Sequence, residues 1–103
     1  MSRIVQPPKF QSSSVLYSWD FTSLLQFSEI IGSAFIDVSV YSGTDPIPYI
    51  ILSGLPSISG NVVSQLITGG VEGVIYNVDC SAVTSLGQTL IISSYISIIP
   101  TLT

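Results

Sequence analysis

The side chains that could carry chemistry are few and widely spaced in this sequence. The chain has no histidine, one cysteine and six carboxylates. The carboxylates are Asp20, Glu29, Asp37, Asp45, Glu72 and Asp79. General acid–base catalysis most often uses histidine, and glycoside hydrolysis needs a pair of carboxylates, which no adjacent acids supply here. We therefore predict that the protein is not an enzyme and has no catalytic residue.

Metal and cofactor sites are equally weakly supported. A calcium site needs several oxygens that converge on a tight loop, whereas Asp45 and Glu72 are single acids in separate turns. A lone thiol cannot build a zinc site, and Cys80 lies on the apolar face of its predicted strand, which indicates a core residue. The glycine-rich residues 69–73 have no nearby lysine and lead into a strand, which favours a turn over a phosphate-binding loop. We predict no cofactor and no metal.

The charged residues are scarce, and the two signs are separated along the chain. Over 103 residues the net charge is −4 and only 8% of residues are charged, against about a quarter in typical domains. The two cations, Arg3 and Lys9, lie in the first nine positions, and no lysine or arginine follows. Nucleic-acid binding requires such cations, so we predict no nucleic-acid partner. No apolar run approaches the ~20 residues of a spanning helix, and the first 14 residues lack the apolar region of a signal peptide, so we also predict no membrane partner.

The first 14 residues differ in composition from the rest. They contain both cations, a serine run and the adjacent prolines Pro7 and Pro8. Adjacent prolines exclude a helix and favour an extended path. We therefore expect an extended N-terminal arm over residues 1–14 and one domain over residues 15–103. The arm is either a free terminus or a segment that orders on a neighbouring subunit.

The body of the chain is patterned for β-strands. It is rich in Ile, Val, Thr, Tyr and Ser, and apolar residues alternate with polar ones between turns spaced roughly ten residues apart. This pattern is typical of an all-β fold, and we expect an immunoglobulin-like antiparallel β-sandwich of about seven strands. Tyr17 and Trp19 fall on the apolar face of the first body strand and should be core residues. A short strand is expected at 49–52, and hairpins are expected across 69–73 and 84–88.

The strand faces opposite the predicted core lack their usual charges. Phe35 and Tyr41 point away from the core in one strand, and Ile91 and Tyr95 do so in the last strand. Exposed sheets usually carry lysine or other charges against unwanted pairing, and uncovered apolar patches mark interaction sites. We therefore expect other copies or other proteins to cover these faces, with the cations of the arm paired to a neighbour's acids. The candidate interface residues are Arg3, Pro7, Pro8, Lys9, Phe35, Tyr41, Ile91 and Tyr95.

The order of these segments resembles a family of virion proteins. The string LYSWDFTSLL at 16–25 is similar to the opening strand of small phage virion proteins, and it precedes SAFIDVSVYSG at 33–43. Residues 69–98 then supply a glycine-led turn, an alternating strand, a Thr-Ser-x-Gly-Gln-Thr turn and a last apolar strand. Together these segments resemble the fibre–tail adaptor proteins of tailed bacteriophages. The resemblance implies a small immunoglobulin-like sandwich, a structural role near the head–tail junction or tail, many copies per virion and no enzymatic activity.

The expected function is therefore that of a non-enzymatic virion protein. As an adaptor it would join tail fibres or other components to the head–tail or tail machinery, as a symmetric multi-copy ring. Its partners would be copies of itself and other virion proteins, such as portal, tail or fibre proteins. One alternative is a capsid decoration or neck protein. Another is a receptor- or carbohydrate-binding module of a fibre, for which Tyr41, Tyr49 and Tyr95 would be the exposed aromatics.

Overall fold

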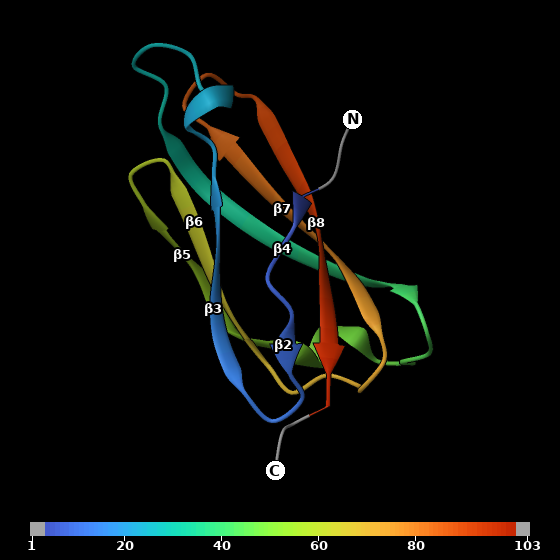
Figure 1. Cartoon of the computed structure of the whole chain (residues 1–103). Helices are drawn as coiled ribbons and strands as arrows, with labels where there is room; N and C mark the ends of the chain where they lie inside the picture. Colours follow the sequence, from blue (N-terminus) through green and yellow to red (C-terminus); the bar gives the residue numbers. More distant parts are fainter. Residues whose placement is uncertain (1–3, 101–103) are drawn as a thin grey trace.

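The computed structural model describes residues 4–100, and nearly all of its regular structure is β (Figure 1). The strands are β1 (Ile4–Val5), β2 (Lys9–Phe10), β3 (Ser14–Asp20), β4 (Ile31–Ser42), β5 (Leu52–Ser59), β6 (Val62–Thr68), β7 (Ile75–Thr84) and β8 (Thr89–Ile99), with the 3-10 turns η1 (Thr22–Leu24) and η2 (Pro48–Ile51). The all-β prediction is confirmed. Two of the eight strands contain only two residues each, which leaves six long ones against the expected seven.

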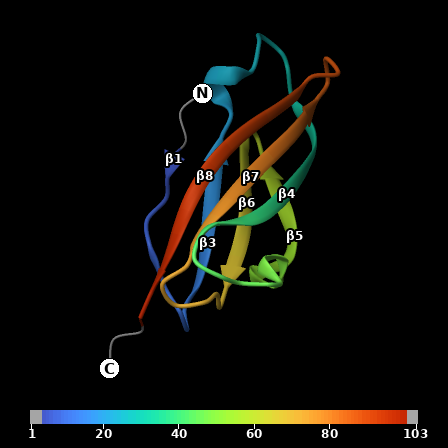
Figure 2. The same ribbon diagram turned by 90° about the vertical axis from the view of Figure 1, so that its right-hand side faces the viewer.

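The strands form two sheets that pack face to face (Figures 1 and 2). In the larger sheet β7 lies between β4 and β8 with antiparallel pairing, and β1 and β2 both pair with β8 in parallel. The smaller sheet has the antiparallel order β3-β6-β5. The predicted two-layer sandwich is therefore present, with two short parallel additions that the sequence pattern did not indicate.

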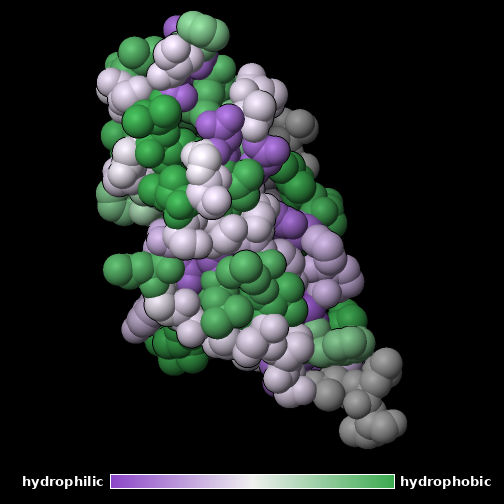
Figure 3. Space-filling view, turned by 90° about the vertical axis from the view of Figure 1, so that its left-hand side faces the viewer, coloured by the Kyte–Doolittle hydropathy of each residue, from purple (hydrophilic) through white to green (hydrophobic). Residues whose placement is uncertain are grey.

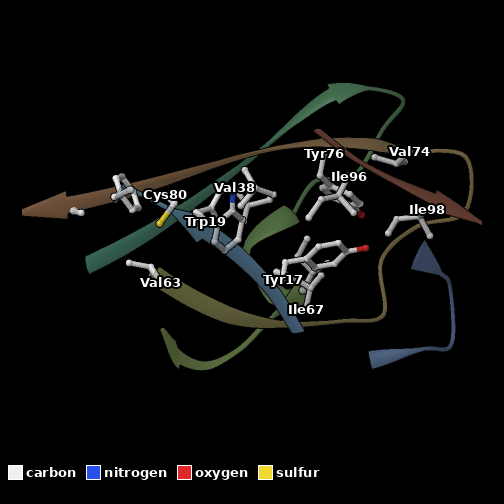
Figure 4. Close-up of a cluster of buried hydrophobic side chains, with 14 of the residues drawn as sticks. Tyr17, Trp19, Val38, Val63, Ile67, Val74, Tyr76, Cys80, Ile96 and Ile98 are labelled. Carbon is white, nitrogen blue, oxygen red and sulfur yellow. The ribbon is translucent and has the colours of Figure 1, made fainter. Parts of the chain in front are cut away.

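The core lies between the sheets and follows the alternation of the strands (Figure 4). Tyr17, Trp19 and Cys80 are all buried there, as predicted. The Trp19 indole Nε1 donates to the Ser94 hydroxyl at 3.0 Å, which in turn donates to the Val78 carbonyl at 3.0 Å. Buried polar groups need such partners, because an unpaired one costs about 1–3 kcal/mol. This chain of hydrogen bonds ties the smaller sheet, through β3, to β8 and β7.

The described part of the expected arm lies against its own chain. The Gln6 backbone N–H donates to the Tyr95 carbonyl of β8 at 3.0 Å, and the Gln6 side-chain amide donates to the Ser18 carbonyl of β3 at 3.1 Å. The Tyr17 hydroxyl donates to the Pro7 carbonyl at 2.8 Å. Residues 4–10 therefore bridge the two sheets along the side formed by β3 and β8 (Figure 1).

The strand expected at 49–52 is wrong for most of its length. Residues Pro48–Ile51 form the turn η2, and β5 begins only at Leu52. Pro48 stands in the first turn of η2, where its fixed φ favours a helical start and its missing N–H is no loss. The run of apolar residues that follows the proline does not by itself distinguish a buried turn from a short strand.

One of the two expected hairpins is also wrong. Residues 84–88 do join the paired strands β7 and β8, with the Thr84 nitrogen 2.9 Å from the Gln88 carbonyl. Residues 69–73 instead connect β6 in the smaller sheet to β7 in the larger sheet. Gly70 has a φ of +103°, and a Cβ there would lie 2.9 Å from the Ile98 side chain. A glycine is required at this position because the chain crosses closely from one sheet to the other, and not because it turns between two paired strands.

Candidate interaction surfaces

The outer face of the larger sheet carries four of the candidate interface residues. Figure 2 views the molecule from the side on which β8, β7 and β4 lie in front of the smaller sheet. Phe35, Tyr41 and Ile91 are 61%, 59% and 46% exposed. Phe35 and Ile91 occupy one row, because both pair with Ser81 of β7. The sequence pattern therefore identified these outward-facing side chains correctly.

The two tyrosines of this face are in contact. The ring centroids of Tyr41 and Tyr95 lie 4.4 Å apart with an angle of 43° between the ring planes. Asn77 stands in the row between Ser39 and Tyr95 and is 9% exposed. The two rings therefore form one aromatic patch on this face. Tyr49, the third aromatic considered for a carbohydrate site, lies in η2.

A pair of acids separates the two apolar parts of the face. Asp37 of β4 is directly opposite Asp79 of β7, which is itself opposite Ser93 of β8. The Asn77 amide donates to the Asp79 carboxylate at 3.2 Å. Directly opposed like charges destabilise a sheet, and the single cation of residues 4–100, Lys9, is bound to carbonyls of its own chain. The spacing of the acids along the chain gave no sign of this pair, because it depends on the register of two strands.

The candidate residues of the N-terminal segment lie apart from this face. Arg3 lies outside the described residues, and Pro7 and Pro8 are exposed between β1 and β2. Lys9 is only 1% exposed. Its ammonium donates to the carbonyls of Phe10 at 2.7 Å and Ser13 at 2.6 Å, with Gln11 at 3.4 Å. Burial lowers the pKa of Lys9, and these carbonyls favour its charged form. In this structure Lys9 is thus bound to its own chain, where the sequence suggested a neighbour's acids.

A feature that sequence reasoning missed is the loop after η1. Glu29 is 4% exposed and accepts hydrogen bonds from the Gln26 backbone at 2.8 Å, the Gln88 amide at 3.0 Å and the Thr84 hydroxyl. These bonds fasten the loop to the β7–β8 turn and leave Phe27 99% exposed at its tip. Aromatic residues are enriched in protein interfaces, so the exposed Phe27 is a further candidate interface residue.

We predict that this loop weakens in acid. Hydrogen bonds from the Gln26 backbone and the Thr84 hydroxyl lower the pKa of Glu29 below its ordinary value near 4.5, against the effect of burial. Because the folded pKa is the lower one, its contribution is complete above pH 4.5 and is lost as pH falls through the folded value. Thermal unfolding between pH 7 and pH 2 should show a smaller acid-dependent loss for Glu29→Gln than for the wild type.

The exposed acid Glu72 supplies the control for this measurement. Glu72→Gln also removes one carboxylate, but from the exposed segment at residues 69–73. The fall of its unfolding temperature in acid should therefore equal that of the wild type. An acid-dependent loss in Glu29→Gln as large as in the wild type would contradict the assignment.

A hollow lies between the free edges of β4 and β5. It has a volume of about 300 Å³ and is lined by Ala34, Phe35, Ile36, Leu52, Gly54, Leu55, Pro56 and Gln65. The buried Gln65 amide holds the irregular part of β5 by donating to the carbonyls of Ser53 at 3.1 Å and Gly54 at 3.3 Å. Figure 3 faces the side on which β5 lies and shows apolar patches among weakly polar surface. The edge strand β5 contains no charged residue of the kind that usually protects sheet edges.

The cysteine and the acids of the described residues are not gathered into a metal site. No group of three or more His, Cys, Asp or Glu side chains that could hold a metal occurs within residues 4–100. Burial raises the pKa of Cys80 to about 12, which leaves it a thiol at neutral pH. Asp45 accepts a 2.6 Å hydrogen bond from the Tyr76 hydroxyl, whose pKa burial and this carboxylate raise to about 12. Asp45 is therefore a structural partner of Tyr76 rather than a simply solvated turn acid.

The same part of the chain has no helix of the length and hydrophobicity needed to cross a membrane.

A family model described as podophage GP4 fiber-tail adaptor protein gp77 matches residues 9–96. The matched range runs from β2 into β8 and so includes both sheets. A search of curated proteins found no match.

Proposed function

The chain belongs to the podophage fiber-tail adaptor family, and we propose that it joins tail fibres to the tail machinery as one copy of a symmetric ring. Membership of this family indicates a structural protein of the virion. The observation that supports the proposal most strongly is that the match spans both sheets of the sandwich. The ring, the position at the head–tail junction and the likeness to immunoglobulin domains are the proposed refinements.

The surface of the molecule supports assembly through large, permanent contacts. The sheet faces expose Phe35, Tyr41 and Ile91, and the loop after η1 exposes Phe27. Permanent interfaces are more apolar than transient ones, and their buried centres are depleted in charge. A low-charge sandwich of this kind is suited to being covered by other virion proteins on more than one side.

The N-terminal segment offers a way to link neighbouring copies. We propose that residues 1–14 act as an arm distinct from the domain at 15–103. In one chain the described part of the arm bonds to β3 and β8 through Gln6, Pro7 and β2. Exchange of an identical segment between copies preserves every such contact while joining the copies, so the arm can link a ring without new chemistry.

The adaptor role predicts a specific defect in particles made without this chain. Phage in which its gene is disrupted should produce filled heads whose tails lack fibres, because the fibres would have no attachment site. Electron microscopy of purified particles measures the fraction with fibres, and purified wild-type protein added afterwards should restore attachment. Normally fibred particles from the disrupted phage would contradict the proposal.

A further inference from the structure

The outer face of β4, β7 and β8 combines apolar side chains with a pair of acids, to which residues 4–100 supply no paired cation. Phe35 and Ile91 lie on one side of the row that holds Asp37 and Asp79, and the pair Tyr41–Tyr95 lies on the other. We propose that this face docks a different virion protein, which places an arginine or lysine over the two acids and apolar side chains against the flanks. The inference rests on the adaptor function, since it names the surface by which the adaptor binds a neighbour.

The charge of the face determines what can cover it. Directly opposed residues of an antiparallel pair have Cβ atoms about 4.5–5.5 Å apart, so the carboxylates of Asp37 and Asp79 repel each other. The described residues contain a single cation, Lys9, and it is buried among carbonyls of its own chain. Covering the acids with an apolar surface would remove their water and leave them unpaired. A partner that supplies a cation also removes this water, but its pairing with the acids offsets the cost.

The same charges disfavour another copy as the occupant. Beyond Lys9 the chain contains acids and no cations, so the body of a second copy would bring only like charge to this face. If two copies met edge to edge along β4, pairing near its middle would bring Asp37 close to its counterpart, beside Asp79 of each copy. In the chain itself, Arg3 is the remaining cation that a second copy could contribute.

The flanking side chains suit a basic residue. An aromatic face attracts a cation, most strongly when the site is dry, and the planar guanidinium of arginine also stacks on such rings. Tyr95 stands in the row next to the acids and contacts Tyr41. On the other side of the acids, Phe35 and Ile91 are exposed and would exclude water once a partner covers them. The face therefore presents carboxylates for charge pairing within an apolar surround that strengthens the pairing.

Neutralising Asp37 tests this inference. Labelled protein is mixed with particles from phage in which its gene is disrupted, and co-sedimentation gives the affinity at low and high salt. We expect Asp37→Asn to bind at least ~10-fold more weakly than the wild type and with a shallower salt dependence. Glu72→Gln removes one exposed charge elsewhere and should bind as the wild type does. In thermal unfolding Asp37→Asn should be at least as stable as the wild type, because a repulsion is gone.

The outcomes separate this inference from the adaptor function. If the wild type does not bind the particles, the adaptor function fails. If the wild type binds and Asp37→Asn binds equally well, only the docking face is rejected. A change in self-association of Asp37→Asn by sedimentation velocity, with particle binding unchanged, would make a second copy the occupant. That result would also overturn the inference, and loss of the same self-association in Arg3→Gln would identify the cation.

Discussion

Replacing Lys9 by methionine is expected to destabilise the protein by about 3 kcal/mol, because hydrogen bonds from a charged group contribute about 1.5–3 kcal/mol each. The methionine keeps the buried stem but loses the bonds to the Phe10 and Ser13 carbonyls. These carbonyls belong to the turn between β2 and β3, where the Ser13 nitrogen also lies 3.1 Å from the Phe10 carbonyl. Urea unfolding followed by tryptophan fluorescence measures the change in free energy.

The second cation of the chain provides the control for Lys9. Arg3→Met makes the same change in net charge, from −4 to −5, and so measures the effect of losing one positive charge by itself. The burial of Lys9 and its bonds to carbonyls predict a larger loss of unfolding free energy for Lys9→Met than for Arg3→Met. Equal stability of Lys9→Met and Arg3→Met would mean that the ammonium contributes nothing beyond its charge, contrary to the structure.

Replacing Trp19 by alanine is expected to cost about 3–5 kcal/mol, the range for removing a large aromatic side chain from a core. Trp19 is 1% exposed and is among the largest fully buried side chains. The substitution leaves a cavity between the sheets and also removes the donor that Ser94 accepts from. Thermal unfolding by circular dichroism should show a large fall in midpoint or no folded baseline.

A second variant keeps this test informative if the alanine variant does not fold. Trp19→Phe fills most of the space but lacks the indole N–H, so it should lose less stability than the alanine variant. Ser94→Ala leaves the indole N–H without its acceptor and should cost about 1–3 kcal/mol. A Trp19→Phe variant as stable as the wild type would show that the hydrogen bond to Ser94 has no role.

The fold class and the core could be predicted because the alternation of side chains is a local signal. The residues of β3, β4, β7 and β8 that the alternation placed inward are buried or partly buried, including Trp19 and Cys80. The turn at 84–88 was also predictable, since its strands are neighbours in both sequence and sheet. The crossing at 69–73 was not, because glycines mark a tight path and do not say which sheet the next strand joins.

The surface features also divide into those that a local pattern predicts and those that it does not. The exposure of Phe35, Tyr41 and Ile91 followed from which face of a strand each occupies. The opposition of Asp37 and Asp79 and the burial of Glu29 depend on contacts between distant segments, so the sequence alone did not indicate them. Lys9 is the clearest departure, since lysine is almost never fully buried and its partners are carbonyls that carry no sequence signal.

The position of this chain in the assembled particle tests the adaptor function most directly. A cryo-electron microscopy map of the virion locates the sandwich and gives its number of copies. The adaptor function predicts a symmetric ring of copies at the tail, each in contact with a tail fibre and with the tail machinery. A lattice of copies over the capsid shell, or a location out of contact with the fibres, would contradict it.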